Sequence, residues 1–349
     1  MEGKRRIGIL TSGGDCPGLN AAIRAAAKTA MRDGYEVIGI NHGWQGFLDN
    51  DYQVLDGMKT SGIIDRGGTI LGTSRLSPFY VENGPQFVFD SFKQLGLEGL
   101  VVLGGDGTLA ATDRLYKMGL PVVGIPKTID NDVRGTDFSI GFQTAVQIAT
   151  DALDRLRSYA ESHHRVMLLE VMGRHAGWIA TYAGMANGAD AILIPEIPMD
   201  SGKIDELCRM LTARNEKGIN FSIVVVAEGT RLDGRTVEKP VHDRSRDGQE
   251  RILGGIADVL GGIIAEKTDL EIRVSSLGYV QRGGIPVAYD RSLATAFGVK
   301  AIDLVAEKKF GQMTALKGNR ITSVPLEVPA GGIKTVHLNI YRVAARFFG

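Results

Sequence analysis

Two acidic corners follow apolar runs near the middle of the sequence. The stretch "VVLGGDGT" (101–108) places Asp106 among three glycines, and "PKTIDND" (126–132) places Asp130 and Asp132 two residues apart. Glycine lets backbone N–H groups approach an anion, and a carboxylate is stable beside phosphate oxygens when Mg²⁺ lies between them. A further carboxylate can take the proton of an attacking hydroxyl. The corners therefore indicate phosphoryl transfer, with a helix cap and an Asx-rich turn as the structural alternatives.

The residues around these acids fit the same chemistry. In an extended segment, Asp130 and Asp132 would point to one side and Asn131 to the other. Lys127 would supply a mobile cation for phosphate charge. The glycine loop "LTSGGDCPGLNAA" (10–22) precedes a helical pattern. It predicts either an anion cradle at a helix N-terminus or a tight turn, since it matches neither the Walker A nor the dinucleotide pattern.

Arginines near glycine turns or strand ends complete the set of candidate phosphate ligands. They are Arg75, Arg165, Arg174, Arg273 and Arg282. A guanidinium can bind a phosphate through two parallel hydrogen bonds. Each arginine taken alone is more often a surface residue. Together with two acidic glycine corners, however, they indicate a site for two phosphorylated ligands and Mg²⁺.

Short apolar strands alternate with helical patterns along most of the chain. The expected strands are 7–10, 36–40, 100–104, 121–125, 166–171, 191–195, 222–229 and 271–276. Such alternation predicts parallel sheets covered by helices on both faces, and so many units suggest two sheets. A long helical pattern over 142–161 could connect them. The polar stretch 230–252 predicts an exposed loop with little regular structure.

The composition excludes several other classes of protein. The chain has 349 residues, of which 44% are hydrophobic and 23% charged, with a formal net charge of +0. This balance gives no sign of a nucleic-acid or membrane partner. Two isolated cysteines, Cys16 and Cys208, suggest a reducing compartment. The N-terminal apolar run is too short for a signal peptide, so we expect a cytoplasmic protein.

Six motifs in sequence resemble the phosphofructokinase family. They are "LTSGGDCPGLNAAIR", "GGTILGTSR", "GGDGT", "PKTIDND", "EVMGRHAGW" and "LGYVQRGG", and the likeness runs from about residue 6 to about residue 305. The resemblance implies an α/β fold of two doubly wound, mainly parallel, Rossmann-like sheets, with the active site in the cleft between them. It implies a donor domain of 1–141 plus about 284–318. The fructose 6-phosphate domain would be about 142–283 plus about 319–349.

The resemblance also implies roles for individual residues. Asp130 would be the catalytic base, with Arg174 and Lys127 also catalytic, and Asp106 would bind Mg²⁺. The donor's phosphates would contact Gly14, Arg75, Gly105, Asp106, Gly107 and Thr108. The sugar phosphate would contact Thr128, Ile129, Asp130, Asp132, Arg165, Met172, Gly173, Arg174, Glu228, Arg273, Tyr279 and Arg282. Arg165 and Arg273 would come from a neighbouring subunit, which implies a homo-oligomer, either a dimer or a tetramer.

The residues that would distinguish the phosphoryl donor form a mixed pattern, because Gly107 and Lys127 occur together. Members that use ATP resemble "GGDG" with glycine in place of Lys127, whereas members that use pyrophosphate resemble "GGDD" with lysine. A side chain at Gly107 would occupy the place of a nucleotide's α-phosphate, so glycine favours ATP. Tyr279 stands where many bacterial members have histidine, and a phenol cannot carry imidazolium charge.

Two other classes of protein remain as alternatives. A NAD or lipid kinase would explain "GGDGT" but would leave "PKTIDND" and "EVMGR" without a role. An inactive regulatory paralogue would be expected to have lost an acid or an arginine at these corners, and none is missing. The sequence therefore predicts an ATP-dependent 6-phosphofructokinase of glycolysis, with a pyrophosphate-dependent enzyme as the main alternative.

Overall fold

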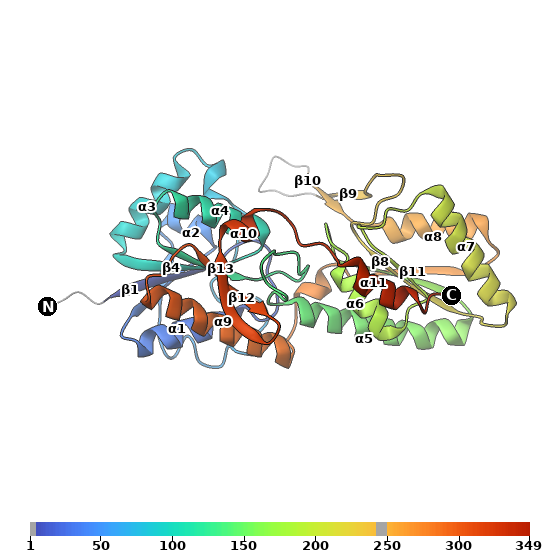
Figure 1. Cartoon of the computed structure of the whole chain (residues 1–349), viewed down its shortest axis with the longest axis horizontal. Coiled ribbons are helices and arrows are strands. Elements are labelled where there is room, and N and C mark those ends of the chain that lie inside the picture. Colours follow the sequence, from blue (N-terminus) through green and yellow to red (C-terminus); the bar gives the residue numbers. More distant parts are fainter. Residues whose placement is uncertain (1–4, 242–249) are drawn as a thin grey trace. The chain divides into compact units, whose positions relative to one another are not determined.

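The computed structural model describes residues 5–241 and 250–349, which form two compact units (Figure 1). Unit 1 consists of Met1–Thr144 and Arg282–Lys334, and unit 2 consists of Ala145–Gln281 and Thr335–Gly349. The chain thus passes between the units three times. The first passage lies within α5 (Phe142–His163), the long helix expected from the sequence.

Unit 1 is built on a sheet with the strand order β13-β12-β5-β4-β1-β2-β3. Its strands are β1 (Arg6–Thr11), β2 (Glu36–Ile40), β3 (Tyr52–Leu55), β4 (Leu97–Gly104), β5 (Val122–Pro126), β12 (Gln312–Lys317) and β13 (Arg320–Pro325). All neighbours pair in parallel except β3 on β2 and β13 on β12. Apart from residues near their ends, such as Arg6 and Glu98, the central strands are largely apolar because helices cover both faces of the sheet.

Helices on the two faces of this sheet bury the central strands. Figure 1 shows α1 (Leu19–Arg32) and α9 (Ala288–Ala306) on one face. The other face carries α2 (Trp44–Asp49), α3 (Gly84–Gln94), α4 (Asp106–Lys117) and α10 (Glu327–Ala330). Close packing of α9 on the alanine-rich α1 requires Gly298, since a Cβ there would lie 2.7 Å from the carbonyl oxygen of Ala22. Small residues therefore set the distance between these two helices.

Unit 2 contains a parallel sheet with the strand order β11-β6-β8-β7. Its strands are β6 (Val166–Val171), β7 (Ala191–Leu193), β8 (Ser222–Ala227) and β11 (Ile272–Ser276). The apolar sides of α7 (Ser201–Glu216) and α8 (Ile256–Lys267) cover one face. Figure 1 shows α5, α6 (Trp178–Asn187) and α11 (Leu338–Ala345) on the other side.

The structure confirms an α/β fold with two mainly parallel sheets, and it differs from the sequence analysis in two places. Residues 319–334 belong to unit 1, because β13 pairs with β12 and extends the unit 1 sheet. The stretch 230–252 is not without regular structure, because β9 (Glu238–Val241) and β10 (Glu250–Leu253) form an antiparallel pair. Residues 242–249 of that stretch lie outside the described residues. No helix in the described part of the chain is long and apolar enough to cross a membrane.

Candidate functional site

The two acidic corners begin at the same edge of the unit 1 sheet. β4 and β5 are parallel neighbours, and Gly104 at the end of β4 lies beside Pro126 at the end of β5. The backbone N–H of Lys127 then donates to the carbonyl of Gly104 at 3.0 Å, so the pairing continues one residue beyond the strands. Ligands of such sheets bind outside the carboxyl ends of the strands. The arrangement therefore brings "GGDGT" and "PKTIDND" together.

The "GGDGT" corner opens directly into α4. Gly105 is the N-cap and Asp106 the first helical residue, and no side chain of the N-cap accepts a hydrogen bond. The alternative of a helix cap at Asp106 is therefore wrong, and the first N–H groups of α4 remain available to an anion. An ideal Cβ placed on Gly107 would meet no neighbouring described atom within 4 Å. A side chain at Gly107 would thus extend into open space. Thr108 is the next residue in the first turn of α4.

The "PKTIDND" corner leads into what we call the acid loop, residues 128–139. The extended geometry expected here is wrong, because Asn131 has a left-handed φ of 51° and its side chain is fully buried. The Oδ1 of Asn131 accepts from the N–H of Ser139 at 3.0 Å, and its Nδ2 donates to the carbonyl of Asp137 at 3.2 Å. Asparagine tolerates this conformation better than most residues. Asn131 therefore holds the loop as a turn that carries an acid on each side.

Residues on either side of Asn131 differ in their exposure. Ile129 is fully buried, so only its backbone could contact a ligand. Thr128 and Asp130 are half-buried. The N–H of Asp130 donates to the Oγ1 of Thr128 at 3.1 Å, and the hydroxyl of Ser139 donates to the carbonyl of Thr128 at 2.8 Å. These bonds fix the start of the acid loop.

Asp132 is buried near two other carboxylates, those of Asp130 and Asp106. Asp132 is only 5% exposed, and no described group donates a hydrogen bond to its Oδ1. Its burial, followed by the negative charges of Asp130 and Asp106, raises the pKa of Asp132 to about 7. Within the described residues there is no preformed cluster of three metal ligands. A site with this excess of negative charge fits Mg²⁺, which one or two carboxylates and the oxygens of a phosphate substrate normally bind together.

Lys127 turns inward and holds the N-terminal glycine loop. Its Nζ donates to the carbonyl oxygen of Gly14 at 2.5 Å, and its side chain is 2% exposed. Burial lowers the pKa of Lys127 to about 8, because the charged amine is removed from water. The same burial raises the pKa of the neighbouring Cys16 thiol to about 12. Lys127 thus links the end of β5 to the loop that follows β1.

The glycine loop is also supported from two other segments of unit 1. The N–H of Gly13 donates to the carbonyl of Ser74 at 2.8 Å, which brings the exposed Arg75 next to the loop. The Nη1 of Arg282 donates to the carbonyl of Asp15 at 3.2 Å, and a Cβ on Gly14 would lie 2.4 Å from that nitrogen. Arg282 therefore lies on the glycine loop of unit 1. Because α1 begins only at Leu19, its dipole does not act directly on Gly13 and Gly14 as the sequence had suggested.

In unit 2, two predicted sugar-binding segments lie side by side after β6 and β8. The N–H of Glu228 donates to the carbonyl of Val171 at 2.9 Å, and that of Gly229 donates to the carbonyl of Gly173 at 3.1 Å. Gly229 must be glycine, because a Cβ would lie 2.1 Å from the carbonyl oxygen of Arg174. Met172 and Gly173 are buried, and Arg174 is exposed. The backbones of the two segments therefore lie next to each other, and Arg174 is exposed on one of them.

Arg165 and Arg273 lie at the amino-terminal ends of β6 and β11, whereas Met172 and Arg174 follow the carboxyl end of β6. The Nε of Arg165 donates to Glu271 at 2.7 Å, and the Nη2 of Arg273 lies 3.7 Å from the same carboxylate. Arg165 also donates to the hydroxyl of Tyr159. Arg165 precedes β6 and Met172 follows it, so the two are separated by the six residues of the strand, roughly 20 Å at about 3.3 Å per residue. Within one chain these arginines are therefore distant from Met172 and Arg174.

Comparison with known proteins identifies relatives of this chain. The sequence profile described as "Phosphofructokinase" matches residues 6–305. A protein of Streptomyces coelicolor named "ATP-dependent 6-phosphofructokinase 3" is 49% identical over 332 residues, which are 95% of this chain and 96% of that protein. A second protein of the same organism, named "Pyrophosphate--fructose 6-phosphate 1-phosphotransferase", is 46% identical over 99% of this chain and 100% of its own length.

The solved structures agree with the sequence relatives. Phosphofructokinase of Pichia pastoris in the T-state superposes with a TM-score of 0.82 at 34% identity, covering 99% of this chain and 37% of the longer one. The chain belongs to the phosphofructokinase family. It is therefore related to phosphotransferases, and relatives of nearly equal similarity are named for two different donors.

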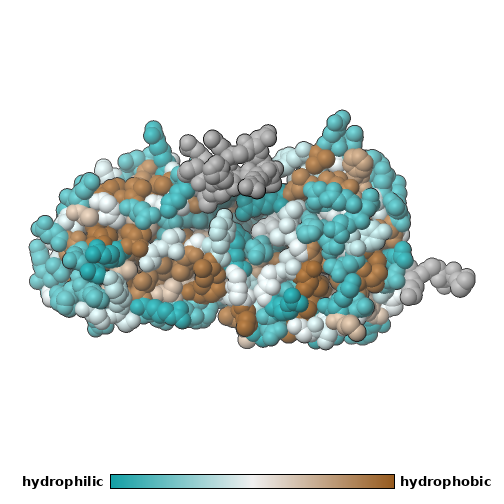
Figure 2. All heavy atoms as spheres, turned by 180° about the vertical axis from the view of Figure 1, so that it is seen from behind, coloured by the Kyte–Doolittle hydropathy of each residue, from teal (hydrophilic) through white to brown (hydrophobic). Residues whose placement is uncertain are grey.

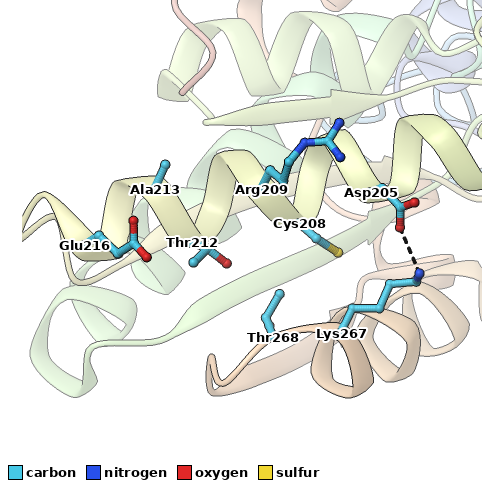
Figure 3. A pocket seen from close by; sticks show the side chains of 8 residues that line it. All are labelled: Asp205, Cys208, Arg209, Thr212, Ala213, Glu216, Lys267 and Thr268. Carbon is cyan, nitrogen blue, oxygen red and sulfur yellow. Dashed lines mark hydrogen bonds and ion pairs between the residues drawn. The ribbon is translucent and has the colours of Figure 1, made fainter.

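One pocket on the surface of unit 2 lies away from the motifs that resemble the family. A pocket of about 490 Å³ lies between α7 and the end of α8 in unit 2 (Figure 3). It is lined by Asp205, Cys208, Arg209, Thr212, Ala213, Glu216, Lys267 and Thr268. None of these is a predicted site residue. Figure 2 shows hydrophobic side chains in several patches of the surface, and Tyr279 is 64% exposed.

Some residues that shape the phosphofructokinase corners were missed by the sequence analysis. Lys334 donates to the acid loop, Ser139 is the last residue of that loop and bonds to Asn131, and Glu271 pairs with Arg165. The polar type of Ser139 in "TDFSIG" was the only local signal for it. Lys334 lies beyond residue 310, where the motifs fade, so nothing in its own neighbourhood indicated a role.

Proposed function

We propose that the chain is an ATP-dependent 6-phosphofructokinase. It would transfer the γ-phosphate of ATP to the 1-hydroxyl of fructose 6-phosphate and give fructose 1,6-bisphosphate, a cytoplasmic step of glycolysis. The observation that carries the proposal is the shared sheet edge from which Asp106, Asp130 and Asp132 emerge, in a chain of this family. On this proposal Asp130 takes the proton of the attacking hydroxyl.

The residues of unit 1 would hold the donor. Gly105, Gly107 and Thr108 offer the open N-terminus of α4 to its phosphates, and Gly14 and Arg75 approach from the glycine loop. Asp106 would bind Mg²⁺, which supplies charge neutralisation between the donor's phosphates during transfer. Lys127 contributes positive charge from behind the loop.

Residues of unit 2, together with the acid loop and Arg282 of unit 1, would hold the acceptor sugar. Met172, Gly173 and Arg174 form one wall, and Glu228 is suited to accept a hydrogen bond from a sugar hydroxyl. Thr128, Ile129 and Asp132 of the acid loop and Tyr279 and Arg282 complete the predicted set. Arg282 donates to the carbonyl of Asp15 in the glycine loop, which is predicted to bind the donor. This contact gives less support to Arg282 as a ligand of the sugar phosphate than to the other residues.

The space beside Gly107 favours ATP as the donor. A nucleotide carries an α-phosphate that pyrophosphate lacks, and a Cβ on Gly107 meets no described atom within 4 Å. The second candidate is a pyrophosphate-dependent enzyme, favoured by Lys127 and by relatives named for that donor. Lys127 already donates to Gly14 and is 2% exposed, which weakens it as a guide to the donor.

An assay with fructose 6-phosphate and Mg²⁺, run separately with ATP and with pyrophosphate, tests the proposal. We expect kcat/KM to be far higher with ATP. A preference for pyrophosphate would overturn the steric argument at Gly107 and make Lys127 the better guide. No turnover with either donor would overturn the proposed function itself.

We also propose that the active enzyme is a homo-oligomer, either a dimer or a tetramer. Arg165 and Arg273 lie about the length of β6 away from Met172 and Arg174 in the same chain, farther than an arginine side chain reaches. If all four bind one sugar phosphate, two chains must contribute. Sedimentation of the enzyme under assay conditions tests this, and a fully active monomer would contradict it.

A further inference from the structure

Residues 333–337 form a short connection between two loops that carry predicted site residues. Unit 1 ends at Lys334 and unit 2 resumes at Thr335. We call Ile333–His337 the 333–337 connection. The family motifs have already ended at about residue 305, so the sequence assigned it no role.

The unit 1 end of the 333–337 connection is bound to the acid loop. Ile333 forms an isolated antiparallel bridge with Val133, and the N–H of Lys334 donates to the carbonyl of Asp132 at 2.7 Å. The Nζ of Lys334 donates to three acceptors: the Oδ1 of Asn131 at 3.0 Å and the carbonyls of Thr136 and Asp137, each at 2.9 Å.

These three bonds use every donor of the Lys334 ammonium group. A planar guanidinium could not reproduce the three directions, and an apolar side chain would supply none. Asn131 is held in its left-handed conformation by this contact and by Ser139. Lys334 therefore acts on the residue between the two carboxylates, and its positive charge opposes the negative charges of Asp132 and Asp137.

The unit 2 end of the connection is bound to the loop that contains Arg174. The N–H of Val336 donates to the carboxylate of Glu196 at 2.8 Å. Glu196 also accepts from the N–H of Gly177 at 3.1 Å, and Gly177 is the N-cap of α6 at the end of the Met172–Gly177 loop. The ring of His337 packs edge-on against Trp178, with centroids 6.0 Å apart.

Only Thr335 separates the two anchors. Consecutive Cα atoms are about 3.8 Å apart, so the Cα atoms of Lys334 and Val336 cannot be more than roughly 7 Å apart. A displacement of one anchored loop is therefore passed to the other with little slack. We propose that the 333–337 connection is a tether that couples the acid loop of unit 1 to the Met172–Gly177 loop of unit 2 through the covalent chain, with Lys334 as the positioning residue for Asp130 and Asp132.

The sharpest test loosens the tether and keeps both anchors. Two glycines inserted after Thr335 leave Lys334, Val336 and Glu196 unchanged. We expect kcat to fall by about 10-fold or more, since a misplacement of about 1 Å can cost ~10²-fold. The control is the same insertion after Gly218, an exposed turn with no described atom near its Cβ position. A kcat within about twofold of wild type for the Thr335 insertion would overturn the tether.

Lys334→Met tests the positioning role separately. We expect kcat to fall by about 10- to 100-fold, with the KM for fructose 6-phosphate within about threefold of wild type. The matched control is Lys309→Met, because Lys309 is an exposed lysine of the same unit that pairs only with Glu307 among the described ion pairs. Wild-type kcat in a folded Lys334→Met protein would overturn the proposal. If this variant does not fold, the insertion variant decides.

A second measurement does not depend on the proposed function, on which the kinetic tests rest. Hydrogen–deuterium exchange of the full chain reports the protection of amides in 128–139. We expect the insertion after Thr335 to speed exchange there, although every hydrogen-bonding group of that loop is retained. Unchanged exchange would overturn the tether even in an active enzyme. Faster exchange in a protein inactive with both donors would support the tether and refute the proposed function.

Discussion

The acid loop of unit 1 and the pair Arg165 and Arg273 of unit 2 are organised in different ways. Asn131 and Asp132 are buried, and backbone and side-chain hydrogen bonds hold the loop from within. Arg273 keeps half of its side chain exposed and is held by one exposed carboxylate, Glu271. Buried hydrogen bonds fix geometry, whereas exposed ion pairs contribute little. On the proposed function, the groups near the reacting atoms would be preorganised, whereas the half-exposed Arg273 could exchange Glu271 for a phosphate.

Replacement of the proposed base should give the largest effect. Asp130→Ala is expected to lower kcat by ~10²–10⁴-fold, the usual range for loss of general-base catalysis, with a much smaller change in the KM for fructose 6-phosphate. Steady-state kinetics with ATP measure both. Asp90→Ala, on the exposed side of α3, is the control. Near-normal turnover of a folded Asp130→Ala protein would remove Asp130 from this role.

A carboxylate at Gly107 should damage use of ATP next most strongly. Gly107→Asp adds bulk and charge where the α-phosphate would lie, and a close like-charge contact costs on the order of a few kcal/mol. We expect kcat/KM for ATP to fall by ~10²-fold and that for pyrophosphate to fall less. Gly57→Asp is the control, because Gly57 also has open space around its Cβ position. Full ATP activity of Gly107→Asp would show that residue 107 does not face the donor.

Loss of an exposed arginine should affect binding more than turnover. Arg273→Ala is expected to raise the KM for fructose 6-phosphate by ~10-fold or more, because one charge-assisted hydrogen bond contributes about 1.5–3 kcal/mol. Arg209→Ala, an exposed arginine elsewhere in unit 2, is the control. If kcat fell instead and KM stayed constant, the contrast drawn between the two regions would be wrong.

The effect expected to matter least for turnover is the pH dependence that Asp132 gives to stability. Its pKa is raised to about 7 in the folded protein, so the folded state binds this proton more tightly than the unfolded state between about pH 4 and pH 7. Stability therefore falls as pH rises through that range. Asp132→Asn should remove this component, on the order of 4 kcal/mol between pH 4 and pH 8 for a pKa raised from 3.8 to about 7. Urea unfolding of both proteins across this range measures it, and parallel curves would contradict the assignment.

The sequence by itself determined the repeated strand–helix pattern and the placement of its acids. Residues 36–40 and 166–171 are strands with the bounds that their apolar runs indicated. Asp106 and Asp130 follow parallel strands because a buried strand must be apolar along its whole length, and the first polar residues mark its end. Such information is local, so it can be read without knowing what packs nearby.

Tertiary structure alone decided which distant residues meet these acids. The left-handed turn at Asn131 depends on Lys334, which is 203 residues away in sequence. The inward direction of Lys127 depends on the carbonyl of Gly14, and the place of β13 depends on pairing with β12. Each of these is a long-range hydrogen bond to a backbone or buried polar group. Many polar groups of the chain could make such a hydrogen bond, so the sequence around a residue does not show which distant group bonds to it.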